Sequence, residues 1–428
     1  MLKKIEKFIS DFDQFLYKKF GSYKSIKVLE NIKEAEIIFS YINVPGEEDK
    51  IRFVGGCIRK ALSGQLIDDI DLASNLDPEE ICEALKKNNI NYYETGIQHG
   101  TITAVIDDYK FEITTLRKDV YTDGRHAKVE FSKDWKVDAL RRDFTINSIY
   151  SDKDGNLFDP FNGKKDLENG IINFIGDPDK RIAEDYLRIL RYLRFFLNYS
   201  KQPHNLEIIR KLKINIGGIS KLSKERLLNE LKKIININTL ENLVKDKLSL
   251  DLFLIIFPEL KNIKIFSKLN INNKIYLEKK DFIFLLSLII VDDFDNADYF
   301  LFKFNISKKD QKRIKIIDRF YKEKINSKTF TENNMNKVFY YDGKEAVIDI
   351  LSHRMIRSKK FDNSLKELIN NYENIKTPEM PISADLLMKK YDISEGKQLG
   401  EKLRAIEEEW VKNNFKISDQ QLNNIVNS

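Results

Sequence analysis

The feature that most limits how this chain can fold is the helical pattern of its C-terminal part. From Arg181 onward, apolar residues recur at the three- and four-residue spacing of one helix face. The first of them are Ile182, Leu187, Leu190 and Leu193. Proline is absent from the sequence between Pro258 and Pro378, so that stretch lacks the residue that most often breaks a helix. We therefore predict that this part is almost wholly helical.

Residues from about 50 to 150 follow a different pattern, that of a mixed α/β unit. Arg52–Val54 leads into two glycines, and a short helix through Leu62 is followed by a strand around Ile67–Ala73. Two further strands, TITAVI and KFEITTL, flank a turn at Asp107-Asp108. The predicted fold class is therefore α+β, with a mixed sheet and its helices in front of an all-helical remainder.

Composition excludes several classes of protein. A length of 428 residues indicates about two to four domains, and a net charge of +6 permits a nucleic-acid partner without requiring one. Two cysteines and four scattered histidines fit neither a disulfide scaffold nor a zinc site. The longest apolar run, Phe282–Val291, is too short to cross a membrane and is predicted to be a buried helix. The N-terminus has no signal-peptide core, so we expect no membrane partner and a cytoplasmic location.

Three acidic residues form the candidate catalytic group. Asp69 and Asp71 are two apart in DDIDLAS on a predicted strand, so both side chains leave the same face. Glu112 in KFEITTL supplies a third carboxylate if its strand is adjacent. Carboxylate oxygens suit one or two Mg²⁺ ions, which activate an attacking hydroxyl and stabilise leaving pyrophosphate. Taken alone, an Asp-x-Asp pair also fits a solvated surface in a chain with 67 acidic residues.

Two glycines and an arginine precede the carboxylates. Gly55 and Gly56 follow a predicted strand and open a helix, where backbone N–H groups can approach triphosphate oxygens closely. Arg59, one turn into that helix, adds a charged donor. We infer a triphosphate-binding turn, although a glycine pair in isolation fits an ordinary tight turn equally well.

These residues are part of a series of motifs that resembles class II tRNA nucleotidyltransferases and bacterial poly(A) polymerases, which belong to the polymerase β-like nucleotidyltransferase superfamily. The ordered motifs are GGCIRKALSGQLIDDIDLAS, EITTLR, VYTDGRHAKVEF, RRDFTINSIY, FDPFNGKKDL, RIAEDYLRILRYLRF and LSKERLLNEL. The resemblance is dense over residues 50–235 and loose over the remainder. Several motifs in a fixed order are far more specific than any one of them.

The resemblance implies a head, neck, body and tail, with a sheet only in the head. We place the nucleotidyltransferase head at residues 1–150, the neck with a base-recognition helix at 151–240, the body at 241–345 and a tRNA-binding tail at 346–428. It further implies an enzyme that adds CCA to the 3′ end of tRNA from CTP and ATP, with magnesium and without a nucleic-acid template. A bacterial poly(A) polymerase and a catalytically inactive RNA-binding homologue remain as alternatives.

The same resemblance assigns roles to single residues. Asp69 and Asp71 match the family's metal-binding aspartates, and Glu112 matches its third carboxylate. The family usually has an aspartate after the arginine of GGxxR, whereas this chain has Lys60. This charge reversal leaves the metal carboxylates unchanged but puts the details of triphosphate handling or local packing in question.

A second group of residues is predicted to recognise the ribose. Arg142, Asp143 and Asn147 lie in RRDFTIN, which resembles the motif that excludes deoxynucleotides. A 2′-OH both donates and accepts a hydrogen bond, which fits this set of side chains. The alternative is a local ion pair between Arg142 and Asp143 that caps a helix.

A third group is predicted to read the incoming base. The segment EDYLRILRYLR is predicted to be helical, with Asp185, Arg188 and Arg191 at i+3 steps along one stripe. The resemblance implies that this stripe contacts the base. An arginine can donate to the ring acceptor of cytosine or adenine while an aspartate accepts from the exocyclic amine. The alternative is an i,i+3 salt bridge on a solvated helix.

The polar segment from Arg117 to Phe131 is rich in turn-forming residues and is predicted to be a mobile loop. It resembles the family's flexible loop, which is associated with addition of the terminal A. The candidate residues in it are Arg117, Asp123, Gly124 and Arg125. Farther along the chain, Pro381–Phe415 resembles the tail of many bacterial and mitochondrial members.

Overall fold

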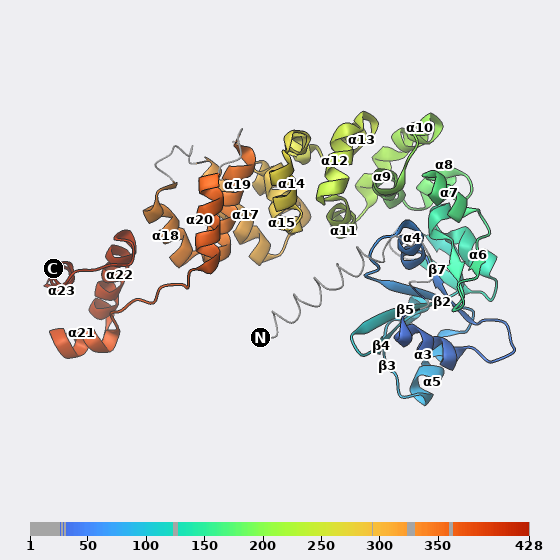
Figure 1. The fold of residues 1–428 in the computed structure, drawn as a ribbon, viewed down its shortest axis with the longest axis horizontal. Coiled ribbons are helices and arrows are strands. Elements are labelled where there is room, and N and C mark those ends of the chain that lie inside the picture. The colour runs from blue at the N-terminus through green and yellow to red at the C-terminus, as the bar shows by residue number, and fades with distance from the viewer. Residues whose placement is uncertain are drawn as a thin grey trace. The chain divides into compact units, whose positions relative to one another are not determined.

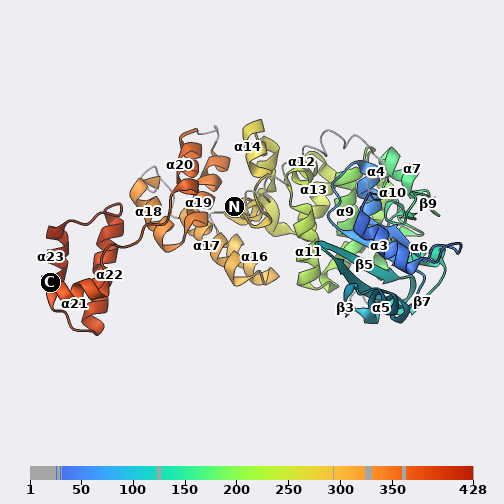
Figure 2. The same ribbon diagram turned by 60° about the horizontal axis from the view of Figure 1, so that its bottom comes forward.

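The computed structural model describes residues 26, 29, 31–122, 127–292, 294–322, 330–358 and 363–427. The chain divides between Leu227 and Leu228 into two compact units (Figures 1 and 2). Within the described ranges, every strand belongs to the first unit and the second is helical. The predicted α+β class, a mixed sheet followed by a helical remainder, is confirmed.

The first unit is built on a seven-stranded sheet with the order β3-β4-β5-β2-β1-β8-β9. Strands β2 and β5 are parallel and every other neighbouring pair is antiparallel, so the sheet is mixed. The strands are β1 (Ile51–Val54), β2 (Ile70–Ser74), β3 (Asn91–Gly96), β4 (Thr101–Ile106), β5 (Tyr109–Thr115), β8 (Tyr150–Ser151) and β9 (Leu157–Phe158). The strand predicted to begin at Ile67 therefore begins three residues later, whereas the turn at Asp107-Asp108 is confirmed.

Three helices share the sheet's apolar core: α3 (Lys33–Ile42), α4 (Gly56–Ser63) and α5 (Pro78–Lys87). Helix α5 begins with a capping box, in which Asp77 and Glu80 satisfy each other's free backbone N–H groups. Helices α3 and α5 lie side by side (Figure 1). The short helix predicted after the glycine pair is α4, which packs on the central strands β1 and β2.

The prediction of a polar loop from Arg117 to Phe131 is partly wrong. Its described ends form two antiparallel strands, β6 (Arg117–Thr122) and β7 (Ala127–Phe131), in a sheet of their own. Pairing of Arg117 with Phe131 closes the base of this hairpin. The β7 sequence AKVEF does alternate apolar and polar residues, but the β6 sequence RKDVYT does not, and the turn-forming residues between them favoured the prediction of a loop.

Helices complete the first unit. They are α6 (Trp135–Arg141), the 3-10 helix η2 (Thr145–Asn147), α7 (Gly163–Asn169), α8 (Pro178–Glu184), α9 (Leu187–Tyr199), α10 (Leu206–Asn215), η3 (Ile216–Lys221) and the start of α11 (Lys224–Ile234). The predicted helix through Asp185 is wrong at that residue, which has an extended backbone (φ −153°, ψ 104°) between α8 and α9. The Asp185 side chain accepts a hydrogen bond from the N–H of Leu187, the first residue of α9, so the chain leaves the helical conformation at Asp185 and resumes it at Leu187.

The second unit is a succession of helices. They are α12 (Ile237–Lys245), α13 (Lys247–Ile256), η4 (Pro258–Lys268), α14 (Ile271–Leu277), α15 (Phe282–Ile290), α16 (Asn296–Phe304), α17 (Lys308–Lys322), α18 (Glu332–Tyr341), α19 (Lys344–Arg357), α20 (Asn363–Asn374), α21 (Ala384–Tyr391), α22 (Lys397–Lys412) and α23 (Asp419–Asn427). The apolar run that begins at Phe282 is the buried helix α15, as predicted. No helix in the described ranges is long and apolar enough to cross a membrane. Helices α21, α22 and α23 share a small core of their own (Figure 2).

Candidate catalytic and nucleotide-binding site

Two of the three predicted carboxylates, Asp71 and Glu112, are direct neighbours at the centre of the sheet, and Asp69 lies just before β2. Strands β2 and β5 are parallel neighbours, and their register pairs Asp71 directly with Glu112. Burial raises the pKa of Asp71, the nearby charges of Glu112 and Asp69 raise it further, and Arg142 and Arg59 oppose them. Like charges on neighbouring carboxylates favour protonation of one carboxylate or binding of a cation. The sheet therefore places Asp71 beside Glu112, and the role of the three carboxylates as a catalytic group stays a prediction.

The acidic group fits a divalent cation in its chemistry. Its donors are hard carboxylate oxygens, and the raised pKa of Asp71 reports a crowding of negative charge that a cation would relieve. As the side chains stand, no three acidic, histidine or cysteine side chains of the described residues form a ready-made metal cluster. Asp69 and Glu112 are exposed, and Asp69 lies just before the first ladder residue of β2. Assembly of a metal site would therefore involve adjustment of exposed side chains.

The glycine pair brings the start of α4 against this group. Gly55 has a positive φ of 71°, and a β-carbon there would lie 3.3 Å from Arg142 Nη1 and 3.9 Å from Asp71 Oδ2. A β-carbon on Gly56 would lie 3.6 Å from Asp71 Oδ2. The pair thus does more than turn the chain, because it lets a helix N-terminus with free N–H groups lie beside Asp71 and Arg142.

Arg59 is buried within protein contacts in this structure. Only 7% of it is exposed, its guanidinium lies 4.7 Å from the Phe195 ring centre and 5.2 Å from that of Tyr199, and its Nη1 donates to Asn147 Oδ1. Its Nε is buried without a hydrogen-bond partner among the described residues. Arg59 therefore connects α4 to η2 and α9, and its predicted contact with a triphosphate stays a prediction.

The predicted ribose-recognition residues form part of one hydrogen-bonded network. Asp143 accepts hydrogen bonds from Asn147 Nδ2 at 2.8 Å and from Arg191 Nε at 2.5 Å. Burial alone would raise the pKa of Asp143, but Arg191 and these hydrogen bonds lower it well below its usual range. The ion-pair partner of Asp143 is thus Arg191 on α9, not the neighbouring Arg142, and the predicted ribose and base groups are physically joined.

Arg142 is held by a carboxylate that sequence reasoning missed. Asp138, 1% exposed, accepts from Arg142 Nη2 at 3.1 Å, from Arg141 Nε at 2.7 Å and from the Tyr150 hydroxyl at 2.6 Å. Burial opposes ionisation, but the two arginines lower the pKa of Asp138 to about 2. The signal was available in the sequence, since Asp138 precedes these arginines by three and four positions on α6.

The three predicted base-reading side chains each have a different ionic partner. Asp185 Oδ2 accepts from Arg226 Nη2 of α11 at 2.8 Å. Arg188, 9% exposed, donates to Glu184 Oε2 at 2.7 Å. The third, Arg191, is paired with Asp143 as described above. The alternative of a simple i,i+3 bridge between Asp185 and Arg188 is therefore wrong. Arg226, in the motif LSKERLLNEL, is a further residue that the sequence did not single out.

The base of the hairpin contacts the same region. Arg117 Nη1 donates to the carbonyl of His99, and the Arg117 backbone N–H lies 3.4 Å from Asp138 Oδ1. Burial, and next the charge of Arg141, lower the pKa of Arg117 to about 10. The other candidates in this segment, Asp123, Gly124 and Arg125, lie outside the described residues.

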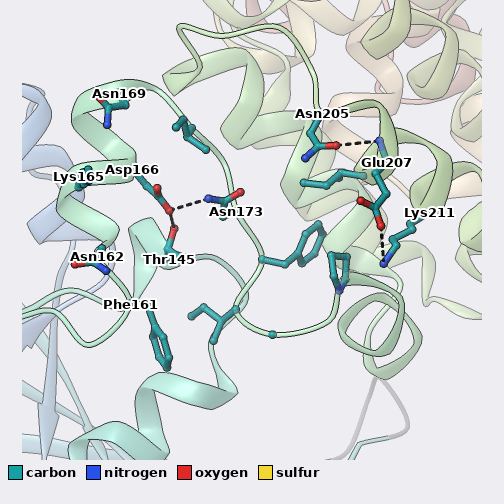
Figure 3. Close-up of a pocket in the computed structure, with 16 residues that line it drawn as sticks. Thr145, Phe161, Asn162, Lys165, Asp166, Asn169, Asn173, Asn205, Glu207 and Lys211 are labelled. Atoms are coloured by element: carbon teal, nitrogen blue, oxygen red, sulfur yellow. Dashed lines mark hydrogen bonds and ion pairs between the residues drawn. The ribbon is translucent and has the colours of Figure 1, made fainter.

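A separate pocket of about 580 Å³ lies between α7 and α10 (Figure 3). Its wall includes Thr145 and Asn173, which both donate to Asp166 Oδ2, at 2.6 and 3.1 Å. Its other wall includes Lys211, whose ammonium is paired with acidic neighbours such as Glu207. The described residues that line this pocket include none of the predicted catalytic or nucleotide-binding side chains. We therefore do not assign the chemistry to it.

Two family models match separate parts of the chain. The model described as the Poly A polymerase head domain matches residues 51–173. The model of tRNA nucleotidyltransferase domain 2 matches residues 277–426. The first match contains the acidic group and the second lies within the helical unit.

Curated relatives and solved structures extend over most of the chain. The mitochondrial CCA tRNA nucleotidyltransferase 1 of Mus musculus is 33% identical over 383 residues, which is 88% of this chain and 86% of that protein. The CCA-adding enzyme of Ligilactobacillus salivarius is 29% identical over 411 residues, covering 93% and 94%. The crystal structure of the Bacillus stearothermophilus CCA-adding enzyme in complex with CTP has a TM-score of 0.70 at 23% identity, covering 89% and 93%. At that identity the structural likeness concerns the fold.

Proposed function

This chain belongs to the CCA tRNA nucleotidyltransferases, and from that premise we propose which of its residues carry out the reaction. The enzyme adds CCA to the 3′ end of tRNA from CTP and ATP. In each step the 3′ oxygen of the primer forms a bond to the α-phosphorus, and the bond to the β-phosphate breaks to release pyrophosphate. The observation that carries our proposal is the direct pairing of Asp71 with Glu112 beside the N-terminus of α4.

The family requires a divalent metal, and we propose that this metal is Mg²⁺ and that Asp69 and Asp71 hold it. When bound, such an ion lowers the pKa of the attacking hydroxyl and offsets charge on the pyrophosphate. Glu112, on the neighbouring strand, completes the carboxylate group. The backbone of Gly55 and Gly56 offers N–H donors to the triphosphate at a helix N-terminus.

The residues that select the nucleotide follow from the network around Asp143. Arg142 is held by Asp138, and Asp143 with Asn147 presents fixed donors and acceptors that suit a 2′-OH. Asp185 and Arg188 offer an acceptor and a donor to cytosine or adenine. Uracil and guanine would leave two polar groups unmet, at about 1–3 kcal/mol each, which predicts discrimination of roughly 10²–10⁴-fold.

Three further assignments are part of the proposal. The head, neck, body and tail keep the boundaries given above, with the tail contacting tRNA. The segment from Arg117 to Phe131, including Asp123, Gly124 and Arg125, acts in addition of the terminal A. We also propose a cytoplasmic location, while noting that the mouse and human relatives are named as mitochondrial. Microscopy of the tagged protein in its own cell would test this location.

The reaction itself is tested with a tRNA transcript that lacks CCA. We expect the purified enzyme to add CCA when CTP, ATP and Mg²⁺ are supplied, as determined by sequencing the 3′ ends. Asp71→Asn should abolish incorporation, because a carboxylate in the acidic group is lost. Asp108→Asn, in the exposed turn between β4 and β5, is the matched control and should keep full activity. A long homopolymeric A tail would support the poly(A) polymerase alternative, and no incorporation by wild type would support the inactive homologue.

A further inference from the structure

Asp69 is not fixed by the sheet that fixes its partner carboxylates. The ladder of β2 begins at Ile70, and Asp71 is held there by its register with Glu112. Asp69 is exposed and belongs to the connection formed by residues 64–69 between α4 and β2. The position of Asp69 therefore depends on what holds that connection.

Contacts near both ends hold the connection. At its start, Gln65 donates its backbone N–H to the Lys60 carbonyl at 2.9 Å and accepts at Oε1 from the Tyr199 hydroxyl at 2.8 Å. At its end, Asp68 is paired through Oδ1 with the ammonium of Lys60. The ion pair between Lys60 and Asp68 thus fixes the residue immediately before Asp69.

Lys60 is placed to act on the acidic group as well as on Asp68. Its side chain is 21% exposed, whereas that of Asp68 is 69% exposed, so the lysine is the more buried member of the pair. Burial lowers the pKa of Lys60, and the charges of Asp69 and Asp71 raise it in opposition. The ammonium therefore lies within the electrostatic field of both proposed metal-binding aspartates.

We propose that Lys60 is a positioning residue that, through its ion pair with Asp68, holds Asp69 where Asp69 and Asp71 can share one divalent cation. This inference rests on the proposed metal-binding role of the two aspartates. It also explains why a lysine suits position 60 in this chain. A carboxylate at position 60 would face Asp68 and repel it, which would push the connection away from α4.

A different account makes Lys60 merely a positive charge that repels the metal. The two accounts predict opposite results for Lys60→Met. Removal of a repelling charge would tighten metal binding, whereas removal of a positioning contact would weaken it. Asp68→Asn breaks the same contact while changing the local charge in the other direction. Weaker metal binding in both variants therefore indicates that the contact positions Asp69.

The test is a titration of full-length protein with Mn²⁺, followed by electron paramagnetic resonance of the free ion. We expect Lys60→Met and Asp68→Asn each to weaken Mn²⁺ binding by about threefold to tenfold. Lys60→Asp should weaken it further, and the exchanged pair Lys60→Asp with Asp68→Lys should return to within about twofold of wild type, because the contact is restored. Lys86→Met, an exposed lysine on α5, is the control and should bind as wild type does.

Activity gives a second readout of the same effect. The Mg²⁺ concentration for half-maximal CTP incorporation should rise in Lys60→Met by the same factor, with KM for tRNA unchanged. Wild-type or tighter Mn²⁺ binding by Lys60→Met overturns the inference, as does an exchanged pair that binds no better than Lys60→Asp alone. If Asp71→Asn binds Mn²⁺ as wild type does, the proposed metal site itself is wrong, whatever the Lys60 variants show.

Discussion

At the scale of single residues, the site depends on carboxylates that are buried and nevertheless charged. Asp138 and Asp143 are both buried, and each is paired with an arginine that the sequence predicts to contact the nucleotide. A buried charge that loses its partner is costly, so each pair fixes its arginine strongly. Arg142 and Arg191 are therefore oriented before a nucleotide binds, which reduces the entropy lost on binding.

The pKa of Asp138 makes a prediction about acid stability. Because this pKa is lowered to about 2 from the model-compound value of 3.8, the ionised form stabilises the fold above about pH 4. That contribution is lost as the pH falls from about 4 towards 2, at about 1.4 kcal/mol per unit of pKa difference. We expect wild type to lose about 2 kcal/mol more stability than Asp138→Asn over this range.

The measurement can be restricted to the first unit. Trp135 packs edge-on against Tyr150 at 5.6 Å between ring centres, and the second of the two tryptophans is Trp410 in α22. In a Trp410→Phe background, urea unfolding followed by tryptophan fluorescence between pH 5 and 2.5 therefore reports on this network. Parallel pH profiles for the two proteins would show that Asp138 is not the titrating group.

At the scale of elements, base recognition depends on the break between α8 and α9. Asp185 lies in that break, with one carboxylate oxygen bound to the Leu187 N–H and the other to Arg226. Its backbone is extended, so the side chain is not part of a continuous helical stripe. The acceptor that we propose for the exocyclic amine is therefore oriented by α11, an element distant in sequence.

Arg226→Gln should lower the discrimination between CTP and UTP. Without the charged donor, Asp185 can rotate, and we expect the ratio of kcat/KM for CTP to that for UTP to fall about tenfold. Single-nucleotide incorporation on a tRNA lacking CCA measures this ratio. Lys224→Gln, an exposed change on the same helix, is the control. A ratio that stays constant while both KM values rise would assign Arg226 a general structural role.

Gly100→Ala tests the role of the hairpin. Gly100 has a positive φ of 75°, and a β-carbon there would lie 2.6 Å from Cε1 of Phe131 at the hairpin base. We expect displacement of that base to slow addition of the terminal A about tenfold while leaving CC addition near normal. Gly46→Ala is a matched control, since its φ is +85° and nothing lies within 4 Å of the added carbon. Gel separation of the CC and CCA products measures the two rates. Equal slowing of CC addition and of terminal A addition would contradict a specific role of the hairpin in A addition.

At the scale of the whole molecule, the proposed chemistry is confined to one of two units. The acidic group, the Asp143 network and Asp185 all belong to the unit that ends at Leu227. The second unit has its own buried helix α15 and, in α21–α23, a further small core. Nucleotide binding and the stability of the second unit should therefore be separable.

Hydrogen exchange measured by mass spectrometry tests this separation. Saturating CTP with Mg²⁺ should protect β2, β5 and α9, because a ligand at 100 times its Kd stabilises the state that binds it by about 2.7 kcal/mol. Peptides from α15 should exchange as they do without nucleotide. Equal protection of α15 would show that the two units unfold together.

The sequence by itself determined the local periods and the identities of the chemical groups. Alternation and helical spacing are properties of neighbouring residues, which is why the central strands, α4 and the buried helix α15 were predicted correctly. The same reasoning failed at Asp185, where the spacing continues but a side chain bonded to the Leu187 N–H starts a new helix.

Only the tertiary structure decided which groups are partners. Glu112 lies beside Asp71 because β2 and β5 are parallel neighbours, and Arg226, near the start of α11, is hydrogen-bonded to Asp185, which is 41 residues earlier in the chain. Lys60 meets Asp68 because the chain reverses after Gly64. Each pairing joins residues that are not neighbours in sequence, so its energy depends on long-range packing that no local pattern contains.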